Sequence, residues 1–234
     1  MMVNEIKKRL RKLGDKERAA VSQRFFKTGP GEYGEGDIFA GITVPELRKL
    51  ARQYRHMTLN DTTELLQSPI HEERLLALLI LIHKFSTGAA PLKKQIFDLY
   101  LNNTRYINNW DLVDVSAQYI VGAYLVQKTK KVLYRLAKSE DFWERRIAIM
   151  STFHFIRQND FSETLKIARV LIADREDLIH KAVGWMLREI GKRDMQTEEE
   201  FLLKYYKQMP RTMLRYAIEK FPKVRRRLYL TGKI

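Results

Sequence analysis

Four residues of this sequence could together act on a group that carries or develops positive charge. They are Trp110, Asp114, Arg146 and Trp185. An indole ring presents an electron-rich face that attracts a cation by about 0.5–2 kcal/mol, and a carboxylate adds a full negative charge. An arginine guanidinium can hold a phosphate through two parallel hydrogen bonds. The set therefore predicts a site that stabilises a cationic transition state on a phosphate-bearing substrate.

Each of these residues also has a structural interpretation. Large aromatic side chains are mostly buried, so Trp110 and Trp185 could belong to the core. Carboxylates near a helix start often cap it, and we assign Asp111 to capping and Asp114 to function. Arg146 could form an ion pair with a carboxylate of its surroundings, such as Asp114. Taken one at a time, the residues leave both interpretations open.

Helical periodicity dominates the chain that must position these side chains. Apolar residues recur at steps of three and four over residues 108–127, 142–157 and 178–190. This spacing places them on one face of a helix. Second helices are expected over residues 91–104 and 127–138, and alternation of the β type is hard to find. The sequence therefore predicts an all-α fold.

An internal repeat organises these helices. Several helices begin with a charged residue that is followed within three positions by a small one. These anchors are spaced by 40, 32, 35 and 34 residues, at Arg74, Asp114, Arg146, Lys181 and Arg215. A period of this size is typical of an α-solenoid, in which each helix pair covers the apolar face of the next. We predict one domain of HEAT-like helix pairs over residues 1–234, with a basic concave face on which equivalent anchors converge.

One segment interrupts the helices. Residues 28–37, TGPGEYGEGD, contain four glycines and a proline, which predicts a loop or short hairpin between the first helix and the next. Its acidic residues argue against contact with phosphate. We interpret this glycine-rich insertion as a flexible connection, with a mobile element that touches DNA as the alternative.

The charge of the chain bears on its partners. Its 234 residues carry a formal net charge of +15, which favours a polyanion, and nucleic acid is the commonest one. An anionic membrane surface and a merely basic protein are the alternatives. Lys192 and Arg193, directly after a predicted helix, are the better candidates for phosphate contact.

The absence of cysteine excludes disulfides and thiolate metal sites. The longest apolar run, Leu75 to Ile82, is too short to span a membrane. We expect a cytoplasmic monomer without metal or cofactor.

Several stretches resemble the AlkD-type DNA alkylation repair glycosylases. They are FAGITVPELRKLAR at 39–52, NNWDLVDVSA at 108–117, DFWERRIAIM at 141–150 and HKAVGWMLREIGKRD at 180–194. The resemblance covers nearly the whole chain in the right order. That family is built of HEAT-like repeats with a positively charged concave groove. Its active members excise 3-methyladenine and 7-methylguanine, which are cationic alkylated purines.

The resemblance implies roles for individual residues. Asp114 matches the catalytic aspartate of the family, Trp110 and Trp185 match two tryptophans that pack on the deoxyribose, and Arg146 matches an arginine that holds the DNA backbone. Two further positions differ from the family pattern. Thr43 stands where a glutamine is expected before the proline, and Phe25 stands where a tyrosine is expected on an early helix. We count both among the residues expected to contact DNA.

The sequence is compatible with three functions. The first is a cofactor-free, monofunctional glycosylase acting on alkylated purines in duplex DNA. The second is a non-catalytic HEAT-like binder of damaged or branched DNA, and the third is a scaffold for protein interactions. Asp114 with both tryptophans favours the first over the second. The net charge favours either DNA function over the third, because a peptide-binding solenoid needs no such field.

Overall fold

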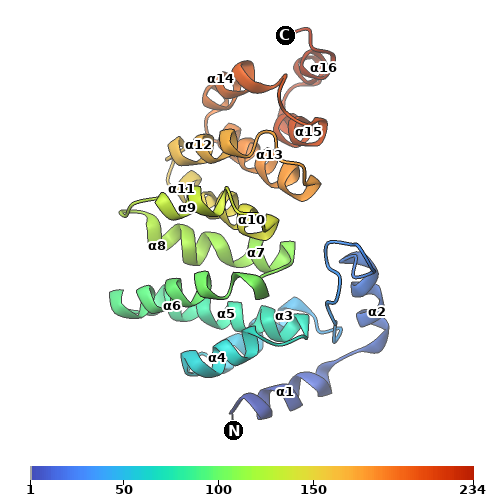
Figure 1. The fold of residues 1–234 in the computed structure, drawn as a ribbon, viewed down its shortest axis with the longest axis vertical. Helices are drawn as coiled ribbons and strands as arrows, with labels where there is room; N and C mark the ends of the chain where they lie inside the picture. Colours follow the sequence, from blue (N-terminus) through green and yellow to red (C-terminus); the bar gives the residue numbers. More distant parts are fainter. Residues whose placement is uncertain (1) are drawn as a thin grey trace. The chain divides into compact units, whose positions relative to one another are not determined.

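The chain folds into helices, as Figure 1 shows. A computed structural model describes residues 2–234. Within these residues there is no β-strand, and the one β-type contact is an isolated bridge between Ile38 and Ile70. No helix among them is long and apolar enough to cross a membrane. The all-α prediction is confirmed.

The chain divides into two compact units, residues 1–124 and residues 125–234. The expectation of a single domain over residues 1–234 stays a prediction. The first unit contains these helices: α1 (Met2–Leu13), α2 (Lys16–Phe25), α3 (Val44–Gln53), α4 (Leu59–Leu66), α5 (His71–Thr87), α6 (Ala90–Asn102), a 3-10 turn (Thr104–Tyr106) and α7 (Trp110–Ala117).

Helix α5 forms the centre of the first unit. Its residues 71–81 are all buried, and the helix packs against α3, α4, α6 and α7. A helix that is apolar all round is expected where neighbours cover every face. Helix α2 is different, because none of its residues is buried. Residues on both sides of α2 also hold it to the rest of the first unit: the backbone N–H of Asp15 donates to the carbonyl oxygen of Ala40 at 2.9 Å, and the Phe26 ring stacks on Trp110.

The helix that carries Trp110 and Asp114 is longer than α7 alone. It continues through a π-helical turn (Gln118–Gly122) into α8 (Ala123–Leu125). The side-chain amide of Gln118 donates to the backbone carbonyl of Asp114 at 3.3 Å. Wide turns of this kind are rare and occur often at functional sites. The predicted helix over residues 108–127 is thus present, with an irregular turn in its second half.

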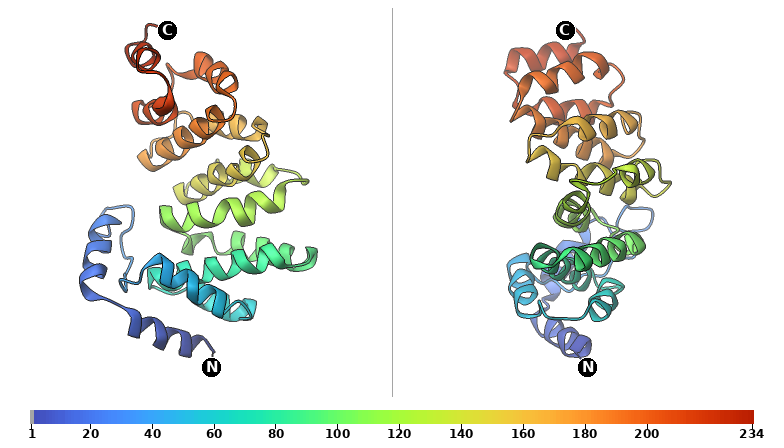
Figure 2. Two further views of the ribbon diagram at one scale, coloured as in Figure 1. Left: turned by 180° about the vertical axis from the view of Figure 1, so that it is seen from behind. Right: turned by 90° about the vertical axis from the view of Figure 1, so that its left-hand side faces the viewer.

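The second unit repeats the arrangement around α13 (Asp177–Gly191). Its other helices are α9 (Lys131–Leu136), α10 (Phe142–Ser151), α11 (Phe153–Ile156), α12 (Ser162–Val170), α14 (Met195–Tyr205), α15 (Arg211–Ala217), a 3-10 turn (Ile218–Lys220) and α16 (Lys223–Thr231). Helix α13 packs against α10, α12, α14 and α15. The succession of helices within each unit can be followed from two further directions in Figure 2.

The contact between α13 and α15 is close because of a glycine. A Cβ atom placed on Gly184 would lie 2.4 Å from the carbonyl oxygen of Met213 and 2.6 Å from the Cβ of Tyr216. No side chain larger than hydrogen fits at that distance without movement of α15. Gly184, a small residue three positions after the repeat anchor Lys181, thus allows the close approach of α13 and α15.

Helix ends follow the punctuation of the sequence. Pro91 lies in the first turn of α6, where a missing N–H breaks no helical hydrogen bond. Pro210 and Pro222 cap the starts of α15 and α16. The second helices expected over residues 91–104 and 127–138 are observed as α6 and the shorter α9. The glycine-rich insertion connects α2 to α3, so it follows two helices rather than one.

Candidate functional site

Trp110 and Asp114 lie one helical turn apart on α7, and both are half-buried. Residues four apart project from the same face of a helix. The helix begins here because the Asn109 side chain accepts a hydrogen bond from the backbone N–H of Trp110 at 2.8 Å. The indole and the carboxylate are therefore presented side by side by one short, capped helix.

The indole of Trp110 is part of an aromatic stack. The Phe26 ring lies parallel to it, with centroids 5.1 Å apart and planes at 19°. The Phe26 ring also stacks on the ring of Phe39, with centroids 4.9 Å apart. Phe25 meets Trp110 edge-on at 6.0 Å and is 64% exposed. One face of the predicted sugar-contacting tryptophan is thus covered by a side chain of the same unit.

His71 lies behind this stack, between two carboxylates. Its Nδ1 is 3.1 Å from Oδ2 of Asp37, and its Nε2 is 2.8 Å from Oδ2 of Asp111. The imidazole also stacks on Phe39, with centroids 4.3 Å apart. An imidazole can donate from both ring nitrogens only when it is protonated. The arrangement is therefore that of an imidazolium bridging Asp37 and Asp111.

Further donors complete the surroundings of Asp37, which is buried. Arg74 donates from Nη2 to its Oδ1 at 2.5 Å, and Asn109 donates from Nδ2 to its Oδ2 at 3.1 Å. Burial alone would raise the pKa of Asp37, but these bonds and the hydrogen bond with His71 lower it. Burial alone would lower the pKa of His71, but its hydrogen bonds to Asp111 and Asp37 raise it. The network thus favours the charged form of both groups.

The first turn of α5 also fixes the backbone of the segment that enters α3. The Glu72 carboxylate accepts hydrogen bonds from the N–H groups of Ala40 (2.8 Å), Gly41 (2.7 Å) and Ile42 (3.2 Å). Gly41 has a φ of +77°, and a Cβ there would lie 2.1 Å from the carbonyl oxygen of Asp15. Only glycine combines that dihedral with that approach.

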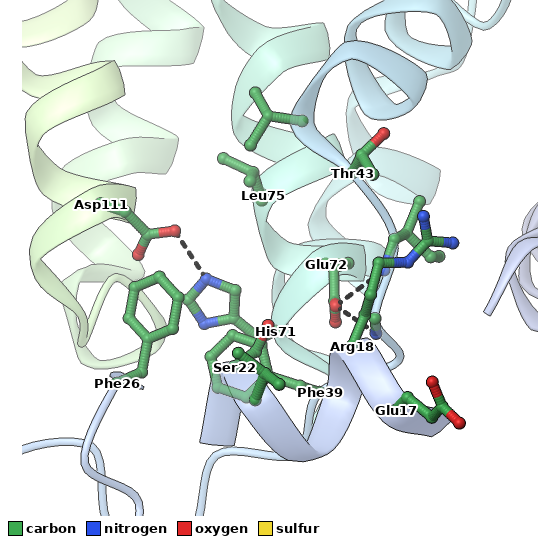
Figure 3. A pocket seen from close by; sticks show the side chains of 14 residues that line it. Glu17, Arg18, Ser22, Phe26, Phe39, Thr43, His71, Glu72, Leu75 and Asp111 are labelled. Atoms are coloured by element: carbon green, nitrogen blue, oxygen red, sulfur yellow. Dashed lines mark hydrogen bonds and ion pairs between the residues drawn. The ribbon is translucent and has the colours of Figure 1, made fainter. Parts of the chain in front are cut away.

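A cavity of about 460 Å³ opens beside this network, between α2, the segment before α3, and the starts of α5 and α7. Figure 3 shows Asp111 on one side of it and Arg18 on the other, with His71 and Glu72 between them. Its walls are mainly apolar, and Val21 and Val44 at the wall are exposed. Charged groups with defined partners therefore border an open, largely apolar space.

Thr43, predicted to contact DNA, lines this cavity and begins α3. Its hydroxyl donates to Oε2 of Glu46 at 2.7 Å, and its backbone N–H donates to the same oxygen at 3.2 Å. These two bonds belong to the start of a helix. Thr43 thus has a structural role, and a contact with DNA stays a prediction.

Two expectations from the sequence need correction. Asp111 does not cap α7, because Asn109 occupies that position; one Asp111 oxygen accepts from the N–H of Leu112 and the other meets His71. The insertion over residues 28–37 is not a free connection throughout. Its last residue, Asp37, is 5% exposed, since Arg74 and His71 hold it.

The remaining predicted residues lie in the second unit. Arg146 of α10 is buried and donates from Nη1 to the carbonyl oxygen of Leu178 at 2.5 Å. Trp185 of α13 is half-buried and donates from Nε1 to Glu189 at 3.0 Å. Lys192 pairs with the same carboxylate of Glu189 at 2.6 Å, so two predicted residues share one acceptor.

Arg193 follows α13 and is exposed. Its Nη1 donates to Oδ1 of Asn159 at 3.3 Å, and Asn159 itself has a φ of +59°. This hydrogen bond is long, and its acceptor is an uncharged amide oxygen. Arg193 is therefore held loosely at the surface, where an anion could compete for it.

The network of Asp37, His71 and Asp111 was not among the predictions from the sequence. A signal was present, because four ionisable residues (His71, Glu72, Glu73, Arg74) directly precede the apolar run from Leu75 to Ile82. Four such residues in a row at the start of a core helix must find partners, since burying an unpaired charge is costly. The partners themselves were not predictable, because Asp37 and Asp111 are 34 and 40 residues away.

Solved structures with similar folds are found among bacterial proteins. A predicted DNA alkylation repair enzyme from Enterococcus faecalis superposes with a TM-score of 0.69 at 19% identity, covering 90% of this chain and 97% of that one. AlkD2 from Streptococcus mutans superposes with a TM-score of 0.57 at 17% identity, covering 89% and 99%. At these identities the likeness shows the fold, which is the predicted helical repeat.

The sequence itself matches one family model. No curated protein is a significant match to the chain. Residues 6–221, nearly the whole chain, match the family described as DNA alkylation repair enzyme. That range includes α7 with Trp110 and Asp114, and α13 with Trp185. This protein belongs to the DNA alkylation repair enzyme family.

Proposed function

We propose that this protein is a monofunctional DNA glycosylase that hydrolyses the N-glycosidic bond of cationic alkylated purines in duplex DNA. The observation that carries the proposal is the family match over residues 6–221 together with Asp114, one turn from Trp110 on the same face of α7. The net charge of +15 supports a DNA partner. The proposal requires neither metal nor redox cofactor.

The chemistry follows from the charge of the lesion. An N-alkylated purine is cationic, so it leaves as a neutral base with the electron pair of the glycosidic bond. Positive charge then develops on the deoxyribose, where a carboxylate and an indole face stabilise it more than they stabilise the ground state. A water molecule adds to C1′ of the sugar and gives a proton to Asp114. Neutral lesions are expected to be poor substrates.

The proposal gives separate tasks to the other predicted residues. Trp185 is assigned to pack on the deoxyribose. Arg146, Lys192 and Arg193 are assigned to backbone phosphates, with Phe25 and Thr43 as further contacts from the first unit. Since phosphate contacts release counterions, affinity for duplex DNA should fall steeply with salt.

The second candidate is a non-catalytic binder of damaged or branched DNA on the same scaffold. One observation favours it: the Phe26 ring covers a face of Trp110 at 5.1 Å. An indole whose face is already stacked has less surface to offer a sugar. The two candidates share DNA binding and differ in base release.

The deciding experiment measures 7-methylguanine and 3-methyladenine released from methylated duplex DNA. For a glycosylase, Asp114→Asn reduces release by about 100-fold or more while DNA affinity is largely retained. Asp98→Asn is the matched control, because that carboxylate makes only a surface pair with Lys94. Release no faster than the spontaneous rate by the native protein, with DNA bound, would establish the non-catalytic binder instead.

A further inference from the structure

A second cavity lies in the second unit, between α15 and α16. Its volume is about 420 Å³, and polar and apolar atoms line it in nearly equal parts. The residues that line it are Thr212, Arg215, Tyr216, Glu219 and Arg226. We call it the arginine cavity, because Arg215 of α15 and Arg226 of α16 both line it.

The cations around this cavity fall into two groups. Glu219 forms ion pairs with Arg188 of α13 and with Lys220, the latter at 2.9 Å. Its hydrogen bond from Lys220 and the charge of Arg188 lower the pKa of Glu219, so it stays ionised. On α16, Arg225, the residue before Arg226, pairs with Glu199. Glu219, the one carboxylate among the described residues that line the cavity, is therefore already paired with two cations.

Arg215 and Arg226 have no such partner. Among residues 2–234, neither side chain makes a hydrogen bond or an ion pair. The Nε atom of Arg226 is buried and lacks any acceptor. A buried donor without an acceptor destabilises the protein, and more so when the donor is charged. An anion that enters the cavity would supply the acceptor for both guanidinium groups.

The donors present suit a phosphate oxygen. A guanidinium offers parallel N–H groups that match two phosphate oxygens, and two of them from different helices can grip one group from two sides. The hydroxyl of Tyr216 adds a neutral donor at the same wall. Thr212 is less available, because it bonds to Asp177. The set is that of a tetrahedral anion site rather than a site for a planar carboxylate alone.

The cavity adjoins the helix that carries Trp185. Tyr216 packs on Gly184, the residue before Trp185, and Arg188 on the same helix holds Glu219. Arg215 is also the last anchor of the sequence repeat, in the position that Arg146 holds two anchors earlier. Resting on the DNA partner of the proposed function, we propose that the arginine cavity binds a backbone phosphate of DNA.

The experiment compares full-length variants in binding fluorescent duplex DNA over a range of salt concentrations. Arg215→Ala/Arg226→Ala removes both guanidinium groups. Arg135→Ala/Lys204→Ala removes the same charge from exposed positions on α9 and α14. Loss of one phosphate contact should lower the slope of log affinity against log salt by about 0.9 and weaken low-salt binding by about tenfold. The control double variant should change both quantities much less.

Two results would overturn the assignment. One is a cavity variant that binds DNA as the charge-matched control does. The other is inorganic phosphate at millimolar concentration raising the melting temperature of the native protein, and not of the cavity variant, while DNA binding is equal in both; the cavity would then take free phosphate. Arg215→Lys/Arg226→Lys keeps the charge and should recover only part of the affinity, which excludes misfolding as the cause. Absence of base release leaves this result unaffected, so the two proposals fail separately.

Discussion

His71 of α5 and Asp111 of α7 are joined by a hydrogen bond of 2.8 Å from Nε2 to Oδ2, and the other ring nitrogen of His71 meets Asp37. The bond ties the start of the central helix of the first unit to the helix that carries Trp110 and Asp114. Through Asp37, the same imidazole ties down the end of the glycine-rich insertion. One titratable ring therefore connects three segments.

His71→Gln should remove a pH-dependent part of the stability. The pKa of His71 is raised above 6.5 in the folded protein, which therefore binds the proton more tightly than the unfolded chain does. This contribution is complete below pH 6.5 and is lost as pH rises through the folded pKa. Urea unfolding between pH 6 and pH 9 should show the native protein losing stability with pH relative to the variant. His56→Gln, at an exposed position, serves as control. Parallel pH profiles for native protein and His71→Gln would contradict the imidazolium bridge.

Phe26→Leu should destabilise the protein more than Phe25→Leu. Phe26 forms stacked pairs with both Trp110 and Phe39, and each aromatic pair is worth about 0.5–1.5 kcal/mol. A loss of about 1–3 kcal/mol is expected for Phe26→Leu. Phe25 also meets Trp110 edge-on but is 64% exposed, so its replacement should cost less, about 0.5–1 kcal/mol. Equal losses in urea unfolding would mean that the stack does not hold the connection after α2.

Gly184→Ala should destabilise the second unit despite the better helix propensity of alanine. Alanine in a helix gains about 1 kcal/mol over glycine where space allows. Here the added Cβ would lie 2.4 Å from a backbone carbonyl oxygen of α15, and overpacking of this kind costs about 1–3 kcal/mol or more. The net effect is a loss, measurable as a lower melting temperature. A gain in melting temperature would show that α15 moves away freely.

Glu198→Gln should stabilise the protein relative to the native one by an amount that increases with pH. Burial, and then the charge of Glu199, raise the pKa of Glu198 from 4.5 to about 9, so the folded protein favours the neutral acid. Stability is therefore lost as pH rises from 4.5 through about 9, where the carboxyl must ionise. Glutamine carries no such penalty. From pH 6 to pH 9, the urea concentration at the midpoint of unfolding should rise for the variant relative to the native protein. The exposed control Glu200→Gln should show no such rise. A gain independent of pH would refute the neutral acid.

The helices themselves could be predicted from sequence, because helix formation depends on contacts over three or four residues. The apolar spacing over residues 178–190 predicted a helix where α13 is observed. The side-by-side placement of Trp110 and Asp114 has the same local origin, since a step of four residues is one helical turn. The roles assigned to them came from motif resemblance and are still untested.

The tertiary structure decided which side chains meet across long separations. Asp37 reaches His71 and Arg74 only because the segment after it is held by Glu72 and turns at Gly41, whose φ is +77°. Phe26 covers Trp110 because the same segment brings it back against α7. No periodic pattern in the sequence predicts either contact, since both depend on the conformation of a loop. The repeat spacing gave Arg215 an anchor position, but only the packing of α15 and α16 placed Arg226 beside it without a counter-charge.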